Sequence, residues 1–155
     1  MNKKIAIFLV LLLSVTTFLT ACSSKGSSNE EKVDKDGTVE LTWYMIGTPQ
    51  KDINKVMDKV NEYTKEKINT TVNMKQIDWG DYDKKMQVMI ASGEPFDIAY
   101  TAGGNYVLNA QKGAFTDLNE LLDTHGKELK AALDPAFIEG AKIDGKLYGI
   151  PSNKE

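Results

Sequence analysis

The side chains that could carry out covalent chemistry are few and widely separated along the chain. His125 and Cys22 are the sole histidine and cysteine, so there is no internal disulfide and there are too few ligands of these types for a zinc site. Asp81 and Asp83 could resemble the carboxylate pair of a glycosidase, but they fall at the start of a predicted surface helix. Gly103-Gly104 lacks the spacing of a phosphate-binding loop. The sequence therefore predicts no catalytic residue, no metal and no cofactor, which favours a protein that is not an enzyme.

The composition is typical of a folded domain with a slight acidic excess. The 155 residues are 41% hydrophobic and 26% charged, which disfavours general disorder, and the length suggests one domain. Lys and Arg number 19 against 22 Asp and Glu, giving a net charge of −3, and every one of these cations is a lysine. No basic stripe is present to neutralise phosphates, so nucleic acid is disfavoured as a partner.

Any site must be positioned by alternating strands and helices. Val39–Ile46, Asn69–Ile77 and Phe96–Tyr100 read as strands, while Lys51–Lys67 and Asp81–Ser92 carry apolar residues at helical spacing. This β-α-β-α-β order predicts an α/β fold in which a parallel sheet is flanked by helices. Further along, we expect helices at Asn105–Gln111, Leu118–Leu122 and Lys127–Leu133, a turn at Pro135–Ala141, and a hairpin around Asp144-Gly145.

Open parallel sheets bind ligands beyond the carboxyl ends of their strands. In this sequence the rule selects three loops, Gly47–Gln50, Asp78–Tyr82 and Thr101–Asn105. Two residues inside the predicted strands carry further expectations. Trp43 lies mid-strand and is expected in the core, and Asp97 in an otherwise apolar strand needs a hydrogen-bond partner or water.

The first 21 residues have the features of a signal peptide. Lys3 and Lys4 make a positive start, and the uncharged run Ile5–Leu19 is shorter than the roughly 20 apolar residues of a membrane-spanning helix. The segment Leu19–Cys22 then resembles a bacterial lipobox, in which a peptidase cuts before the cysteine and the thiol carries a diacylglycerol. The resemblance implies lipidation at Cys22 and firm attachment to the cell membrane.

The segment 22–38 is polar, with Val33 its only large apolar side chain. We expect it to be a flexible tether between the lipidated cysteine and a folded part at 39–155. A tether of this kind implies that the folded part works on the extracellular face of the membrane.

Four motifs in order, behind the lipobox, resemble the extracellular solute-binding proteins of ABC importers, specifically the carbohydrate-type group of Gram-positive bacteria. The motifs are Leu41–Tyr44, Met89–Ile98, Gly113–Leu118 and Asp144–Pro151. The resemblance implies the first lobe of a two-lobe fold like that of the periplasmic binding proteins. It also implies an incomplete chain, since such proteins run to several hundred residues.

A sugar ligand needs flat aromatic faces for its apolar surfaces, and amides and hydroxyls for its own hydroxyls. The candidates for binding are Trp79, Tyr82, Tyr44, Tyr100, Thr101, Asn105 and Asn153. The function that the resemblance implies is capture of a sugar or oligosaccharide for the ABC permease subunits, by closure of two lobes over the ligand. Two alternatives stay open: a tethered lipoprotein that binds a peptide or another solute, and a tethered hydrolase.

Overall fold

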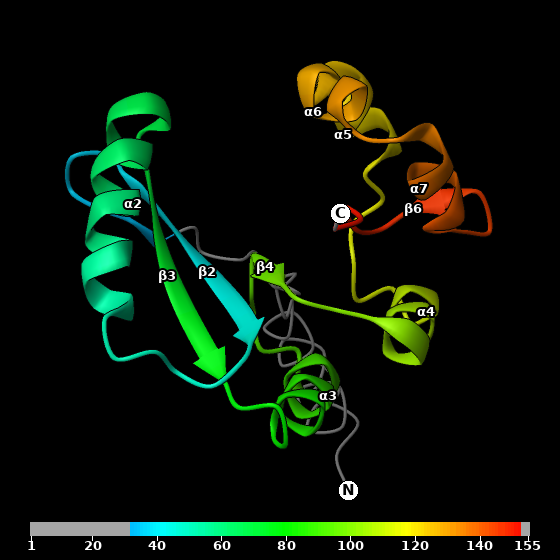
Figure 1. Ribbon diagram of the computed structural model, residues 1–155, viewed down its shortest axis with the longest axis horizontal. Helices are drawn as coiled ribbons and strands as arrows, with labels where there is room; N and C mark the ends of the chain where they lie inside the picture. Colours follow the sequence, from blue (N-terminus) through cyan, green and yellow to red (C-terminus); the bar gives the residue numbers. More distant parts are fainter. Residues whose placement is uncertain (1–31, 153–155) are drawn as a thin grey trace, which may run out of the picture. The chain divides into compact units, whose positions relative to one another are not determined.

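The structure is a computed structural model that describes residues 32–152, so the predictions for Cys22, the signal segment and Asn153 lie outside the described residues. Within them, the main sheet consists of β1 (Lys32–Val33), β2 (Val39–Ile46), β3 (Thr70–Ile77) and β4 (Ile98–Ala99). β2 is parallel to β3 along its whole length and parallel to β4 at its centre. The predicted parallel β-α-β-α-β sheet with flanking helices is confirmed (Figure 1).

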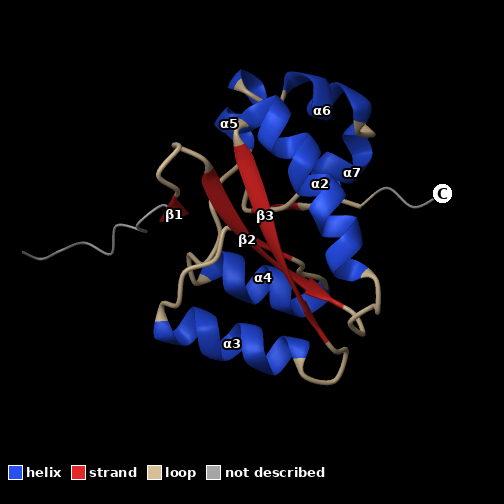
Figure 2. Ribbon diagram, turned by 90° about the vertical axis from the view of Figure 1, so that its left-hand side faces the viewer, coloured by secondary structure: helices blue, strands red, loops and turns tan. Residues whose placement is uncertain are grey.

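The helix α2 (Ile53–Ile68) connects β2 to β3 and runs alongside β3 (Figure 1, Figure 2). Its Asn61 side chain bonds the main chain of Val72 twice, accepting from the N–H at 2.7 Å and donating to the carbonyl at 3.1 Å. Both main-chain groups of an edge-strand residue are thereby satisfied within the chain, which limits pairing with another strand at that point. None of the helices in residues 32–152 combines the length and the apolar character that crossing a membrane requires.

The core of the sheet lies against α3 (Tyr82–Ser92), which connects β3 to β4. Tyr82, Met86 and Met89 on one stripe of α3 pack with Tyr44 of β2. The predicted stop at Gly93 is also observed, because this glycine adopts a φ of 70° and donates to the carbonyl of Ile90.

β4 is short, and a side chain strengthens its pairing with β2. The Thr42 N–H donates to the Asp97 carboxylate at 2.7 Å, and the Asp97 N–H donates to the Thr42 carbonyl at 3.2 Å. The expectation that Asp97 needs a partner is confirmed.

The remaining elements follow β4 in the order expected. They are α4 (Gly103–Gln111), α5 (Asn119–Thr124), α6 (Lys127–Ala132), α7 (Pro135–Gly140), β5 (Lys142–Ile143) and β6 (Lys146–Leu147). The turn expected at Pro135–Ala141 is a short helix, because Pro135 suits its first turn and Asp134 caps it by accepting from the Ala136 N–H at 2.8 Å. The β5–β6 hairpin turns at Asp144 and Gly145, both with positive φ, as an Asp-Gly turn predicts.

The last residues of the segment expected to be a flexible tether are part of the folded structure. Lys32–Val33 pairs antiparallel with β2, and Thr38 is buried. The turn between them is tied to α2, since Lys65 donates to the Asp36 carboxylate at 2.8 Å and lowers the pKa of that group. Two residues are too few to show a strand period in the sequence, which is why β1 was missed.

Candidate functional site

The three loops that the sequence selected meet at the carboxyl edge of the sheet. The Gly47 N–H donates to the Ile77 carbonyl at 2.8 Å, and the Thr48 hydroxyl donates to the Asp78 carboxylate at 3.0 Å, which joins the first two loops. The Tyr82 hydroxyl donates to the Tyr100 carbonyl at 2.6 Å and joins the second loop to the third. These bonds hold one continuous edge.

Two of the predicted binding residues lie under this edge rather than on its surface. The side chains of Tyr82 and Tyr44 are buried, with 2% and 8% exposed. The Tyr82 hydroxyl also lies 3.2 Å from the Tyr44 carbonyl, so its one proton is shared between two acceptors. Burial raises the pKa of both phenols. Their rings therefore serve the core and position the edge above them.

Trp79 and Tyr100 present more of their surface. Trp79 is 66% exposed, so it does not pack over the start of α3, and Tyr100 is 39% exposed. The Tyr100 ring meets the Tyr82 ring edge-on, with 6.1 Å between centroids. The structure thus offers two aromatic side chains at the edge, one of them largely free of neighbours.

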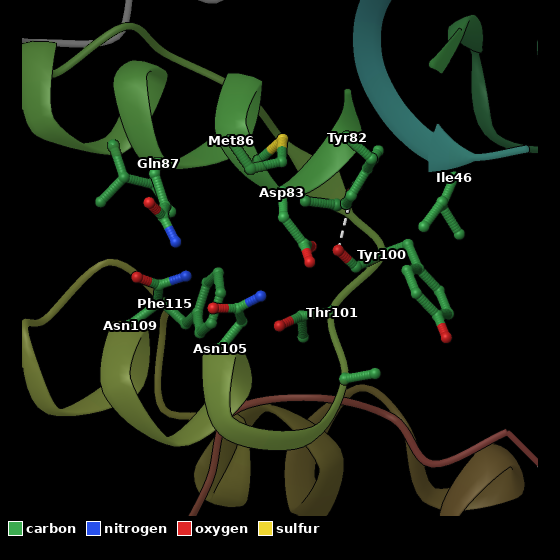
Figure 3. Close-up of a pocket in the computed structure, with 13 residues that line it drawn as sticks. Ile46, Tyr82, Asp83, Met86, Gln87, Tyr100, Thr101, Asn105, Asn109 and Phe115 are labelled. Carbon is green, nitrogen blue, oxygen red and sulfur yellow. Dashed lines mark hydrogen bonds between the residues drawn. The ribbon is translucent and has the colours of Figure 1, made fainter. Parts of the chain in front are cut away.

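Thr101 and Asn105 lie on the wall of a cavity of about 160 Å³ between α3 and α4 (Figure 3). Asp83 and Gln87 enter it from α3, and Asn109 enters it from α4. Sequence reasoning missed these last three residues. The signal that could have found them is their spacing, because Asp83/Gln87 and Asn105/Asn109 each place two polar side chains four residues apart on one helix face.

A larger hollow of about 570 Å³ borders the same loop on another side, and most of its lining is apolar. Trp43 and Met45 of β2 line it together with Phe96, Tyr148 and Ile150. Trp43 was expected in the core, but it is only partly buried here, since mid-strand placement does not tell which face of a sheet is covered.

Neither space has the chemistry of a metal centre. Among residues 32–152, no three His, Cys, Asp or Glu side chains come together in a group that could hold a metal ion. What the cavity between α3 and α4 offers instead is amides, hydroxyls, one carboxylate and aromatic rings, which suit the recognition of a polar, uncharged ligand.

Comparison with known proteins identifies the class. The family model of the bacterial extracellular solute-binding proteins matches residues 59–155, more than half of the chain. A carbohydrate ABC transporter substrate-binding protein of Streptococcus pneumoniae serotype 4 (strain ATCC BAA-334 / TIGR4) is 36% identical over 149 residues, which cover 96% of this chain and 30% of that protein. The chain therefore belongs to the bacterial extracellular solute-binding proteins, and the resemblance inferred from the four motifs is confirmed.

Solved structures agree with this assignment. The N-glycan transport solute-binding protein NgtS of Streptococcus pneumoniae in complex with Man5GlcNAc is 41% identical, with a TM-score of 0.68 over 72% of this chain and 24% of that one. The substrate-binding protein Lmo0181 of Listeria monocytogenes in complex with cycloalternan is 27% identical, with a TM-score of 0.58 over 71% of this chain and 28% of that one. The present chain spans less than a third of the length of each of these relatives.

Proposed function

We propose that this chain forms part of the substrate-binding component of a bacterial ABC importer that captures an oligosaccharide. The observation that carries the proposal is the 41% identity with NgtS, whose structure holds Man5GlcNAc. The chemistry of the edge supports it, because Trp79 and Tyr100 can face a sugar ring and Thr101 and Asn105 can bond its hydroxyls.

The mechanism we propose is capture without chemistry on the ligand. A ligand that touches this edge and a second lobe stabilises the closed state by its differential affinity for that state. The partners would be permease subunits in the membrane. Lipidation at Cys22 would hold the protein on the extracellular face, next to those subunits.

The alternatives predict other outcomes for the same measurement. A tethered hydrolase would cleave the oligosaccharide, whereas family membership and the ligand chemistry of the edge favour binding alone. A peptide-binding lipoprotein would ignore sugars.

Calorimetric titration at the natural full length of the protein separates these functions. Man5GlcNAc, mannotriose, cycloalternan and a set of short peptides are suitable probes. We expect a sub-micromolar Kd, about −8 kcal/mol or stronger, for at least one oligosaccharide, with the sugar recovered intact and no binding of peptides. Binding of peptides alone would overturn the proposal in favour of the peptide alternative, and recovery of a cleaved sugar would favour the hydrolase.

A further inference from the structure

Several polar side chains that line the cavity between α3 and α4 form no hydrogen bond with other residues in 32–152. Apart from the phenols of Tyr82 and Tyr100, the lining has five polar side chains, none of which bonds any residue within 32–152: Asp83, Gln87, Thr101, Asn105 and Asn109. Figure 3 shows Asp83 and Gln87 from α3 and Asn105 and Asn109 from α4 pointing toward a common space. Asn109 is the most enclosed of them, with 6% of its surface exposed.

A buried amide without partners is costly, because its transfer from water is uncompensated. Buried side-chain polar groups in folded proteins nearly always have a partner, and each exception calls for an explanation. Asn109 lies in the last turn of α4, and its amide reaches the cavity rather than another side chain. Its amide atoms are open to the cavity, so their hydrogen-bond partner is the water or the ligand that occupies it.

The volume of the cavity limits the size of the molecule that can occupy it. About 160 Å³ holds roughly five waters at about 30 Å³ each. It lies well below the roughly 300–1,000 Å³ of pockets for drug-sized molecules. A single small ring or a short polyol fits this space, whereas a whole oligosaccharide must extend out of it.

The donor set limits the chemistry. Three amides and one hydroxyl can both donate and accept, and the Asp83 carboxylate accepts only. None of the lining residues is cationic, so an anion such as a phosphate finds no counter-charge. Phe115 adds an aromatic wall beside the amides. Alternating donors and acceptors next to an aromatic face match a neutral ring that carries hydroxyl groups.

We propose that the cavity between α3 and α4 is a subsite for one sugar ring of a bound oligosaccharide, with Asn109 and Gln87 as the residues that select it. This inference rests on the proposed function. It adds a specific position at which one unit of the oligosaccharide enters the protein. Recognition there is by hydrogen bonds, whereas Trp79 offers ring stacking at the exposed edge. In the absence of sugar the same groups bind water, which the ring displaces on entry.

The test replaces each amide by an apolar side chain of similar size, in the protein at its natural full length. Asn109→Leu and Gln87→Met remove the hydrogen bonds and keep the bulk. Asn54→Leu on α2 and Gln111→Met at the end of α4 make the same changes at exposed positions outside the cavity. Man5GlcNAc and mannotriose are the probes, measured by calorimetry, and thermal melts confirm that each variant is folded.

We expect the Kd for the bound glycan to rise at least tenfold in Asn109→Leu and in Gln87→Met, and to stay within twofold in the two controls. Nuclear magnetic resonance gives a second readout on the unmodified protein. The side-chain amide signals of Asn109, identified by their loss in Asn109→Leu, should shift when glycan is added, while those of Asn54 should not.

The failures are distinguishable. If the wild type binds a glycan while both cavity variants keep its affinity and the Asn109 signals stay in place, the subsite is overturned and the proposed function survives. If the wild type binds none of the probes, the proposed function and the subsite fall together. If Asn109→Leu does not fold, the affinity of Gln87→Met still tests the subsite, because Gln87 is exposed and its substitution leaves the core intact.

Discussion

The hydroxyl of Tyr82 donates a hydrogen bond of 2.6 Å to the main-chain oxygen of Tyr100. Tyr82 is the first residue of α3 and lies in the core, whereas Tyr100 directly follows β4 and borders both the polar cavity and the apolar hollow. A single buried phenol therefore fixes the loop that carries Thr101 and leads into α4, on which Asn105 lies.

Removing that hydroxyl should loosen the loop and destabilise the fold. Tyr82→Phe keeps the ring but leaves two main-chain acceptors near it with one partner fewer. A buried acceptor without its bond costs about 1–3 kcal/mol, and we expect a loss of this size in urea unfolding. Tyr63→Phe is the matched control, because Tyr63 is 63% exposed and should change stability little. Equal stabilities of the two variants would contradict the role assigned to the Tyr82–Tyr100 bond.

The same phenol should make the protein sensitive to alkali. Burial raises the pKa of Tyr82 above the value of about 10 that the unfolded chain has. Above pH 10 the unfolded state loses this proton while the folded state keeps it, so the free energy of unfolding falls as pH rises. Below pH 10 the contribution is fully present.

Urea midpoints between pH 8 and 11 measure this effect. We expect the alkaline decline to be shallower in Tyr82→Phe than in the wild type, but not absent, because the pKa of Tyr44 is raised by burial and by the charge of Glu94. Identical declines in the two proteins would show that the Tyr82 phenol is not the titrating group.

The sheet could be predicted from the sequence because local signals and tertiary structure agree there. Val39–Ile46 forms a strand with the predicted bounds, Gly93 ends α3 in the left-handed conformation, and Asp144-Gly145 makes the hairpin turn. Each of these features is determined by residues that are close in the sequence, so the local sequence is enough to predict it.

The candidate site could be predicted only in part, because it depends on which way side chains point after packing. Tyr82 satisfies both a helical apolar stripe and a loop at the ligand edge, and only the packing of α3 against β2 decides that it is buried. Gln87 and Asn109 lie on the same cavity only because of the way α3 packs next to α4, and no local sequence pattern encodes that packing. The position of Thr101 and Asn105 near the carboxyl end of β4 could be predicted, because the rule for strand ends needs only the order of elements.

The next prediction is lipidation at Cys22, which lies outside the described residues. The lipobox-like segment Leu19–Cys22 leads us to expect that the wild type, expressed in a Gram-positive host, remains in the membrane fraction with the mass of a diacylglycerol adduct. Cys22→Ala removes the thiol and should release the protein. Cys22 is the only cysteine, so no other thiol can substitute for it. Release of the wild type to the same extent as Cys22→Ala would refute the anchor.

The last prediction concerns Trp79, which is 66% exposed at the edge of the sheet. Exposure of this kind leaves its ring free to stack on a sugar, so Trp79→Ala should weaken glycan binding by about 1–3 kcal/mol, the scale on which an aromatic anchor contributes to binding. Because the ring contributes little to the core, the melting temperature should change little.

Trp43 provides the matched control for the same substitution. It is partly buried and lines the apolar hollow, so Trp43→Ala should lower the melting temperature clearly. Melts and titrations with Man5GlcNAc on both variants, at natural full length, separate stability from binding. A Trp79→Ala protein that melts early yet binds glycan with unchanged affinity at low temperature would show that this ring supports the fold and not the ligand.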